Sequence, residues 1–433
     1  MRIALYTLGC KVNQYESQAI SELLIQKGHT IVDPSQSADA YIINSCTVTA
    51  TGDAKSKKAA RHFKKNSPDA VIALIGCFPQ AFPEKAQKLE WVDIVLGNKD
   101  KKRVVELLEE FFEKNQRTFA VTEHPKTAHI EDLTITSFEE RTRAFVKIQD
   151  GCNRFCSYCI IPTARGRICS KPLNEIQSEI ENLVSNGYNE IVLVGIDLSS
   201  YGSEFNKTLT DAVLAVSKIN GVKRIRLGSL EPEIISDEDI ERLSKIENFC
   251  PQFHLSLQSG CDKTLKAMNR HYTADEYRTI VKKLRAAFPN VAITTDIMVG
   301  FAGESDEDFN ESLAFALEMR FLKVHVFPYS VREGTRAAKF EGQISPEIKK
   351  ERARKMIEKT EAMRQEILRS TLGEIREVLL ESRTKNGFGI GYTKDYIPVY
   401  VKSCNTALGE LVLVRLTSLY EDGCLGEIVE EQK

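Results

Sequence analysis

Short apolar runs alternate with amphipathic segments over the first quarter of the chain. The runs at residues 3–8, 41–43, 71–75 and 94–96 predict strands, and helical periodicity predicts helices at 13–27 and 103–113. Such alternation is typical of a parallel sheet flanked by helices. We therefore expect residues 1–115 to form an α/β domain.

A polar connection at residues 117–140 has little apolar periodicity, and we expect a linker there. Six strands are predicted after it, at residues 145–148, 191–194, 225–227, 253–257, 292–299 and 324–327. Helical segments lie between them, such as 173–186, 273–287 and 306–319. Six such units predict a partial or full (β/α) barrel over residues 138–370, with its active site at the carboxyl ends of the strands.

The end of the chain has a different pattern. Residues 345–370 carry Lys, Arg, Glu and Met at helical spacing, which predicts a solvated helix that joins two bodies. Alternating runs at 377–382, 397–402 and 410–416 predict a small antiparallel β-barrel over residues 371–433. Barrels of this kind often bind nucleic acid, but this one carries more acidic than basic side chains, so a structural cap remains an alternative.

Composition narrows the class of protein. With 433 residues, 42% hydrophobic and 28% charged, the chain has a globular and not a disordered composition. A formal net charge of −2 means that any RNA contact must come from local basic clusters. No apolar run approaches the roughly 20 residues of a membrane span, and the apolar stretch at the N-terminus is too short for a signal peptide. The 11 cysteines are dilute and odd in number, which indicates reduced thiols and a cytoplasmic protein.

Three cysteines after the first predicted barrel strand are the main chemical signal. Cys152, Cys156 and Cys159 have three and then two residues between them. Three thiolates suit a four-iron cluster in which one iron has no protein ligand and can hold a substrate or cofactor. A structural zinc site is the alternative, but no second Cys or His pair follows nearby.

Three further cysteines each close a predicted strand of the first domain. Cys10, Cys46 and Cys77 follow the first, second and third apolar runs. Because the carboxyl ends of parallel strands meet at one edge of a sheet, these thiols are expected to converge. Three unrelated buried cysteines are the alternative. The shared position favours a second four-iron cluster with one open iron.

The Cys-x-x-x-Cys-x-aromatic-Cys spacing after a barrel strand resembles the radical S-adenosylmethionine (SAM) superfamily. With the three N-terminal cysteines and the small terminal barrel, the whole chain resembles the methylthiotransferases. This resemblance implies a flavodoxin-like N-terminal domain, a radical SAM partial barrel and a C-terminal TRAM domain. Cys169, Cys261 and Ala302 depart from the residues usual in the family, and none of them replaces an expected ligand.

Within that family, residues 8–17 (LGCKVNQYES) and 149–153 (QDGCN) are most similar to the bacterial branch that acts on threonylcarbamoyladenosine at position 37 of tRNA. The isopentenyladenosine branch typically has Gln-Met-Asn after its first cysteine, and the branch that modifies an aspartate of a ribosomal protein has Pro-Lys-Asn. These two substrates are the alternatives within enzymes. A non-catalytic iron–sulfur or RNA-binding protein is the alternative of another class.

The resemblance also implies the cofactors and the chemistry. Two [4Fe-4S] clusters and two SAM molecules would take part. One electron would cleave the first SAM to a 5′-deoxyadenosyl radical, which would take hydrogen from C2 of the adenine. Sulfur would then come from the second cluster, and the second SAM would give the methyl group. The partners implied are the tRNA anticodon loop, a one-electron reductant and a sulfur donor, with no membrane.

Four residues are expected to contact SAM. Tyr158 would pack near its adenine, and Gly195, Gln258 and Gly300 fall at strand ends where the superfamily's SAM-contacting segments lie. For phosphate contacts the sequence offers Arg165 and Arg167 after the cysteine loop, and a basic run within residues 55–65. A solvated helix face is the commoner meaning of such a run.

Overall fold

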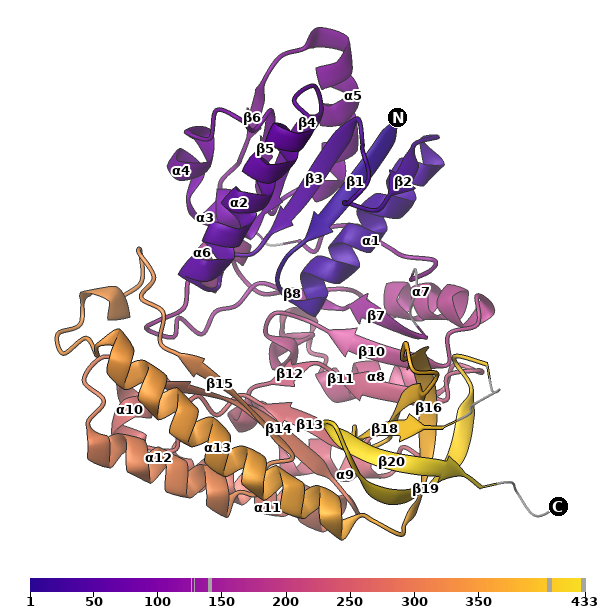
Figure 1. Ribbon diagram of the computed structural model, residues 1–433, viewed down its shortest axis with the longest axis vertical. Helices are drawn as coiled ribbons and strands as arrows, with labels where there is room; N and C mark the ends of the chain where they lie inside the picture. Colours follow the sequence, from indigo (N-terminus) through magenta and orange to yellow (C-terminus); the bar gives the residue numbers. More distant parts are fainter. Residues whose placement is uncertain (126, 128, 139–141, 403–406, 430–433) are drawn as a thin grey trace.

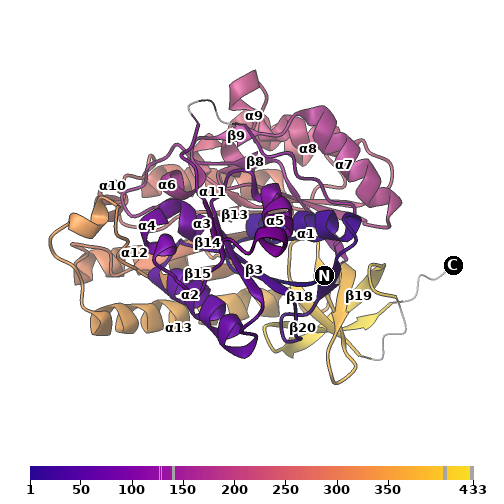
Figure 2. The same cartoon turned by 90° about the horizontal axis from the view of Figure 1, so that it is seen from above.

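The computed structural model describes residues 1–125, 127, 129–138, 142–402 and 407–429. The chain forms an N-terminal α/β unit, a half-open barrel and a small closed barrel (Figure 1). The α/β unit lies above the half-open barrel in Figure 1, and the yellow closed barrel lies beside it. Figure 2 shows the same arrangement from above. The predicted fold class of three parts is confirmed.

The N-terminal sheet has six parallel strands in the order β2-β1-β3-β4-β5-β6. Its strands are β1 (Arg2–Thr7), β2 (Thr30–Val32), β3 (Ala40–Ser45), β4 (Val71–Gly76), β5 (Ile94–Leu96) and β6 (Thr118–Ala120). Helices α1 (Lys11–Gln26) and α5 (Val104–Lys114) bury their apolar faces on one side. Helices α2 (Ala50–Asn66), α3 (Cys77–Ala81) and α4 (Pro83–Gln87) cover the other. The first five strands follow the flavodoxin order, which places a ligand site at the strands' carboxyl ends.

The sequence pattern missed β2 and β6, because three residues are too few to show a period and each of these strands begins with a polar Thr. The strand β5 is equally short but was predicted from its unbroken apolar run. β6 lies within the predicted linker, yet it pairs in parallel with β5 and extends the sheet beyond residue 115. Farther along the same segment, Leu133 and Ile135 are buried in the core of the half-open barrel. Where the structure describes it, this connection is therefore packed, and the expectation of a plain linker is wrong. Residues 126, 128 and 139–141 of the predicted linker lie outside the described part.

The half-open barrel consists of two parallel sheets, ordered β11-β10-β7 and β12-β13-β14-β15, which a bridge between Ile225 and Phe249 joins. The strands are β7 (Arg143–Lys147), β10 (Glu190–Val194), β11 (Arg224–Leu227), β12 (Ser229–Leu230), β13 (Gln252–Leu255), β14 (Ala292–Val299) and β15 (Lys323–Pro328). A short pair, β8 (Gln149–Asp150) and β9 (Cys169–Ser170), follows β7. The described strands β7 and β15 do not pair with each other, so the barrel is partial.

The barrel helices are α6 (Ile161–Arg165), α7 (Leu173–Ser185), α8 (Leu209–Ser217), α9 (Asp237–Ser244), α10 (Asp262–Ala267), α11 (Ala274–Ala287) and α12 (Asp306–Glu318). Four of them begin with a capping box, in which a Ser or Thr and an acidic residue three positions later satisfy each other's backbone N–H. These caps are Thr208, Ser236, Thr273 and Ser305. Each capping box fixes the residue at which its helix begins.

The last helix, α13 (Pro346–Ser370), packs against β15 and buries Met356, Met363 and Leu368. It is therefore part of the barrel wall, and the expectation of a solvated connecting helix is wrong for that face. The small barrel closes in the order β16-β17-β18-β20-β19. Its strands are β16 (Ile375–Arg383), β17 (Gly389–Thr393), β18 (Pro398–Val401), β19 (Leu411–Tyr420) and β20 (Gly423–Ile428). No helix in the described residues is both long and apolar enough to cross a bilayer.

Candidate functional site

The three-cysteine loop follows β7 and β8 at the carboxyl ends of the barrel strands. The Cys152 backbone N–H donates to the Gly166 carbonyl at 3.0 Å, which closes the loop on the end of α6. Gly151 has a φ of 74°, and a Cβ there would come within 1.9 Å of the Arg167 carbonyl oxygen. Only glycine fits this position, which brings the loop onto the following segment.

Charged side chains surround the triplet. Asp197 Oδ2 lies 3.9 Å from Cys152 Sγ, and Arg270 Nη1 donates to Cys156 Sγ at 3.3 Å. Arg270 also pairs with Glu231. These three residues were not predicted from the sequence. Asp197 follows β10 and Glu231 follows β12, but nothing in the sequence separates them from the other acidic residues of loops.

Two thiols of the triplet, those of Cys152 and Cys159, have raised pKa values and are protonated in the metal-free protein. Burial, with Asp197 nearby, raises the pKa of Cys152, and burial raises the pKa of Cys159 to about 12. Iron binding would therefore release protons. Two buried carboxylate oxygens near Cys152, Asp197 Oδ1 and Glu233 Oε2, have no hydrogen-bond partner among the described residues. Such acceptors suit the amino group or hydroxyls of a cofactor, so the residues fit a cluster with bound SAM.

The four residues expected to contact SAM lie at the same end of the barrel. Tyr158 stacks edge-on to Phe301 at 6.3 Å between ring centres. Gly195 follows β10, and a Cβ there would come within 2.8 Å of Gln149 Oε1. That oxygen accepts from the backbone N–H groups of Ile196 and Asp197.

Gln258 and Gly300 hold unusual backbone conformations. Gln258 has a φ of 67°, in the left-handed region that is costly for a side-chain-bearing residue. Backbone bonds to Asp296 and Met298 on β14 hold it there. Gly300 has a φ of 69°, and a Cβ there would come within 2.4 Å of Lys349 Cγ. Both positions keep backbone close to the mouth of the barrel.

The three N-terminal cysteines lie at the carboxyl ends of their strands. Cys10 caps α1, Cys46 follows β3 and Cys77 opens α3. A Cβ on Gly9 would come within 3.2 Å of Cys46 Sγ, so the first two loops touch. Burial, together with the neighbouring thiols of Cys77 and Cys10, raises the pKa of Cys46 to about 11. The sheet thus brings together the three sulfurs that the sequence placed at one edge.

No group of three or more His, Cys, Asp and Glu side chains within the described ranges is spaced to hold a single metal ion. A four-iron cluster takes its sulfur ligands at the corners of a cube and so from farther apart. Two buried polar atoms border the N-terminal thiols without a hydrogen-bond partner among the described residues, Asn98 Oδ1 and Arg165 Nε. Asn98 Nδ2 donates to Cys77 Sγ at 3.3 Å. An unpaired donor beside three thiols fits an anionic iron–sulfur group.

Each N-terminal cysteine loop is fastened to the barrel domain. Asn98, bonded to Cys77, also donates to the Ala164 carbonyl at 2.6 Å. Next to Cys46, Thr47 accepts from Arg332 at 2.9 Å. The third link runs from the Cys10 loop through Asn13 to Arg165. These three contacts hold the N-terminal cysteine loops against the barrel domain.

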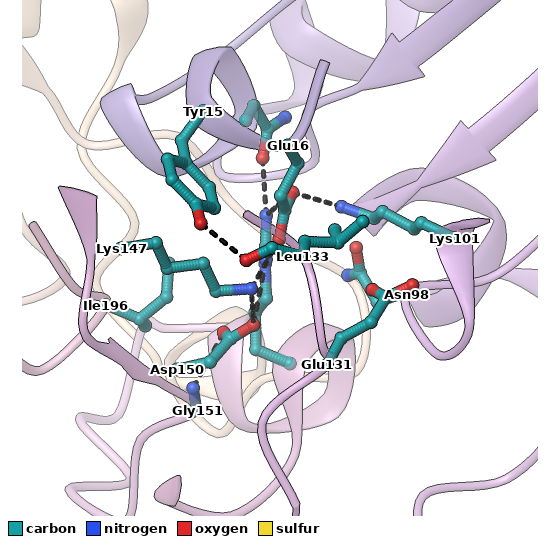
Figure 3. A network of polar contacts seen from close by, with 12 residues as sticks. Tyr15, Glu16, Asn98, Lys101, Glu131, Leu133, Lys147, Asp150, Gly151 and Ile196 are labelled. Carbon is teal, nitrogen blue, oxygen red and sulfur yellow. Dashed lines mark hydrogen bonds and ion pairs between the residues drawn. The ribbon is translucent and has the colours of Figure 1, made fainter. Parts of the chain in front are cut away.

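A buried charge cluster connects α1, which follows Cys10, with the segments on both sides of the cysteine triplet. Figure 3 shows the cluster from close by. Glu16 accepts from Lys101, from Lys147 at 2.7 Å and from Arg165 at 2.6 Å. Asp150, two residues before Cys152, pairs with Lys147 at 2.6 Å and with Arg165 at 3.2 Å. The three cations hold the pKa of Glu16 well below its usual range despite burial. The prediction that Arg165 contacts phosphate is wrong, because its side chain is 1% exposed.

One cavity of about 510 Å³ is lined by all three parts of the chain. Lys11, the residue after Cys10, comes from the N-terminal unit, and Tyr392 and Tyr396 come from the small barrel. The half-open barrel contributes inward-facing strand residues, including Arg143, Arg226, His254, Asp296, Lys323 and His325. The volume is in the range of small-molecule and nucleoside sites.

The basic run predicted on the surface lies on α2, which begins just after Cys46. Lys55, Lys58, Arg61 and Lys65 are exposed there. Lys64 contributes less to this positive surface, because its ammonium group pairs with Asp93 at 3.1 Å. The helix therefore presents a positive face next to the N-terminal cysteines, and Arg167 is exposed beyond α6.

Comparison with known proteins gives three family matches along the chain. They are the uncharacterized protein family UPF0004 over residues 2–97, the radical SAM superfamily over 146–316 and the TRAM domain over 369–429. In fold, the chain is similar to the radical SAM methyltransferase TsrM of Kitasatospora setae, solved with cobalamin and a [4Fe-4S] cluster. That match has a TM-score of 0.58 at 12% identity and covers 90% of this chain and 80% of the other.

Relatives match over almost the whole length. The threonylcarbamoyladenosine tRNA methylthiotransferase MtaB of Bacillus subtilis (strain 168) is 37% identical, over 99% of this chain and 97% of that protein. The MtaB of Thermotoga maritima is also 37% identical, over 99% and 98%. A tRNA-2-methylthio-N(6)-dimethylallyladenosine synthase of Alkaliphilus oremlandii is 35% identical, over 98% and 92%.

Proposed function

Because the chain belongs to the radical SAM tRNA methylthiotransferase family, we propose that it converts N6-threonylcarbamoyladenosine at position 37 of tRNA to the 2-methylthio derivative. Relatives named for the threonylcarbamoyl substrate are 37% identical, and those named for dimethylallyladenosine are 34–36% identical. That difference is small. The choice of threonylcarbamoyladenosine over dimethylallyladenosine rests on the cavity between the three domains.

The two candidate bases differ most at N6. A threonylcarbamoyl group ends in a carboxylate and a hydroxyl, whereas a dimethylallyl group is wholly apolar. The cavity is lined by five Lys and Arg side chains and two Asp, with two His besides. Several of these cations are already paired, as Arg226 is with Glu190. Lys323 is 41% exposed and forms one ion pair with the residues that the structure describes, to Glu361 at 3.3 Å, so it has N–H groups to offer an anion. Cations of this kind favour a carboxylate-bearing base.

Six cysteines would hold the two [4Fe-4S] clusters, with Cys152, Cys156 and Cys159 on the barrel and Cys10, Cys46 and Cys77 on the N-terminal sheet. SAM would lie between the first cluster, Tyr158 and the strand ends at Gly195, Gln258 and Gly300. When bound, these groups supply the radical, the sulfur and the methyl group, so that a C2–H bond is replaced by C2–S–CH₃. With sulfur at the sulfide level, the products are 5′-deoxyadenosine, methionine and S-adenosylhomocysteine, and the electron that starts the reaction is regained.

The chain's own residues position the substrate and exclude water. Arg143 lies over the rings of Tyr392 and Tyr396, 5.3 Å from each, at the small-barrel end of the cavity. The exposed cations of α2 would contact phosphates of the anticodon stem, and the small barrel, which matches the TRAM domain, would contact the RNA as well. A one-electron reductant and a sulfur donor are the further partners, and the cytoplasm is the compartment where tRNA is met.

The test uses anticodon stem-loops that carry either base. We expect methylthiolation of the threonylcarbamoyl stem-loop, and at least about a tenfold lower kcat/KM for the dimethylallyl one, since a charge-assisted hydrogen bond is worth about 1.5–3 kcal/mol. Lys323→Met should lower kcat/KM for the threonylcarbamoyl substrate about tenfold, whereas Lys359→Met, exposed on α13, should not. Equal rates on the two stem-loops would refute the proposed substrate, and no 5′-deoxyadenosine from either would refute catalysis.

A further inference from the structure

Arg165 belongs to the barrel domain but makes its strongest contacts with the N-terminal domain. It lies six residues after Cys159 and ends α6. Its two Nη atoms donate to both oxygens of Glu16, at 2.6 and 3.2 Å, and Nη2 also donates to Asn13 Oδ1. Asn13 Oδ1 lies 3.9 Å from Cys10 Sγ. One guanidinium thus connects the barrel's cysteine loop to the first N-terminal cysteine.

The ion pairs around Arg165 contain three cations and two carboxylates. Lys101, Lys147 and Arg165 pair with Glu16 and Asp150 within the described residues, and four of these five side chains are at most 3% exposed. A third carboxyl, Glu131, accepts from the Lys102 backbone N–H; burial raises its pKa, and Lys147 and Lys101 lower it. Removing a guanidinium from water is unfavourable unless its charge and its N–H groups have partners, so a further acceptor beside Arg165 is expected.

The sulfurs of the N-terminal cysteines are acceptors that lie near Arg165, in the part of the chain that the structure describes. Arg165 interacts electrostatically with the thiols of Cys10 and Cys77, and its Nε has no hydrogen-bond partner among the same residues. Three thiolates make a four-iron cluster site negative. The nearby N–H and the positive charge are the two features that raise the reduction potential of an iron–sulfur cluster.

We propose that Arg165 is a positioning residue through which the barrel domain completes the surroundings of the N-terminal iron–sulfur cluster. It balances the charge of that cluster and holds the Cys10 loop against the loop of Cys152. This inference rests on the proposed second cluster. It predicts that a residue outside the N-terminal domain sets the stability and the potential of the cluster bound there.

The experiment isolates the N-terminal cluster in the full chain. The parent carries Cys152→Ala, Cys156→Ala and Cys159→Ala, and Arg165→Gln, Arg165→Lys and Arg167→Met are each added to it. Arg167→Met is the matched control, because Arg167 is exposed two residues away. Iron per chain, the electron paramagnetic resonance signal and its midpoint potential are measured after anaerobic reconstitution, with no substrate present.

We expect about four irons per chain in the parent and in Arg167→Met. Arg165→Gln should lose at least half of this iron or show a lower midpoint potential, since adding an electron becomes harder without the nearby positive charge. Arg165→Lys keeps the charge and should recover the potential. If Arg165→Gln had the same iron content and midpoint potential as Arg167→Met, the inference about Arg165 would be overturned, but the second cluster would stand. A fall in melting temperature with unchanged iron content and midpoint potential would also overturn the inference, because Arg165 would then contribute only to packing. A parent without iron would instead refute the second cluster itself.

Discussion

Replacing Glu16 by glutamine tests whether the buried charge cluster fastens the two iron–sulfur regions together. Glu16 is 1% exposed and accepts from Lys101, Lys147 and Arg165. Glutamine has nearly the same shape but no charge, so the substitution removes one of the two carboxylates that pair with Lys101, Lys147 and Arg165. Breaking a buried ion pair in this way costs about 3–5 kcal/mol.

That cost can be measured as a shift in melting temperature. For domains of this size, 1 kcal/mol corresponds to about 2–4 °C, so the first unfolding transition should fall by about 6–20 °C. Glu358 is the matched control, because it is 59% exposed and pairs with Arg354 at 3.0 Å on the surface of α13. An exposed pair of this kind is worth about 0.3–0.5 kcal/mol, or about 1–2 °C.

The assay is anaerobic differential scanning calorimetry of wild type, Glu16→Gln and Glu358→Gln. The pKa of Glu16 is lowered in the folded protein, so its contribution is complete above the unfolded value of about 4.3 and is lost as pH falls below it. The gap between wild type and Glu16→Gln should therefore be constant from about pH 6 to 8. A melting temperature for Glu16→Gln within about 2 °C of wild type would show that the cluster does not hold the domains together.

Three further predictions concern the cofactor loops and the RNA surface. Cys152→Ala should abolish 5′-deoxyadenosine formation from SAM, whereas Cys46→Ala should retain it but form no methylthio product; normal methylthiolation by Cys46→Ala would contradict the role of the N-terminal cysteines. Gly300→Ala should be more destabilising than Gly303→Ala, because both have positive φ but only Gly300 is crowded by Lys349; equal melting temperatures would contradict this. The double substitution Lys55→Gln and Lys58→Gln should weaken stem-loop binding, with Lys359→Gln as the control. The slope of log binding constant against log salt concentration should become shallower by about 0.7–0.9 for each phosphate that is no longer neutralised. An unchanged slope would exclude α2 from the interface.

The parts of the fold that repeat a period along the chain were predictable from sequence. Six of the seven described barrel strands, and the cysteines that follow strands of the N-terminal sheet, are local features. The two-residue strand β12 and the strand β6, whose three residues begin with a polar Thr, form no apolar run, and the pairing of β6 with β5 depends on residues far away in the chain.

The polar network was not predictable for a different reason. Glu16 lies on an amphipathic helix, where a glutamate is normally solvated, and it is buried only because the barrel packs on that helix. Arg165 suggested a phosphate contact by its place in a basic loop, yet its partners are 149 and 152 residues away in sequence. Asp197 and Glu231 are recognisable as site residues only once the strands they follow are arranged around the cysteine loop.

Mössbauer spectroscopy of iron-57 protein reconstituted without oxygen tests the central claim, two four-iron clusters on two separate cysteine triplets. The wild-type chain should hold about eight irons as two distinguishable [4Fe-4S] clusters. Replacing Cys10, Cys46 and Cys77 by alanine should remove one set of signals, and replacing Cys152, Cys156 and Cys159 should remove the other. About four irons in the wild type, with no loss on replacing the N-terminal cysteines, would contradict the account.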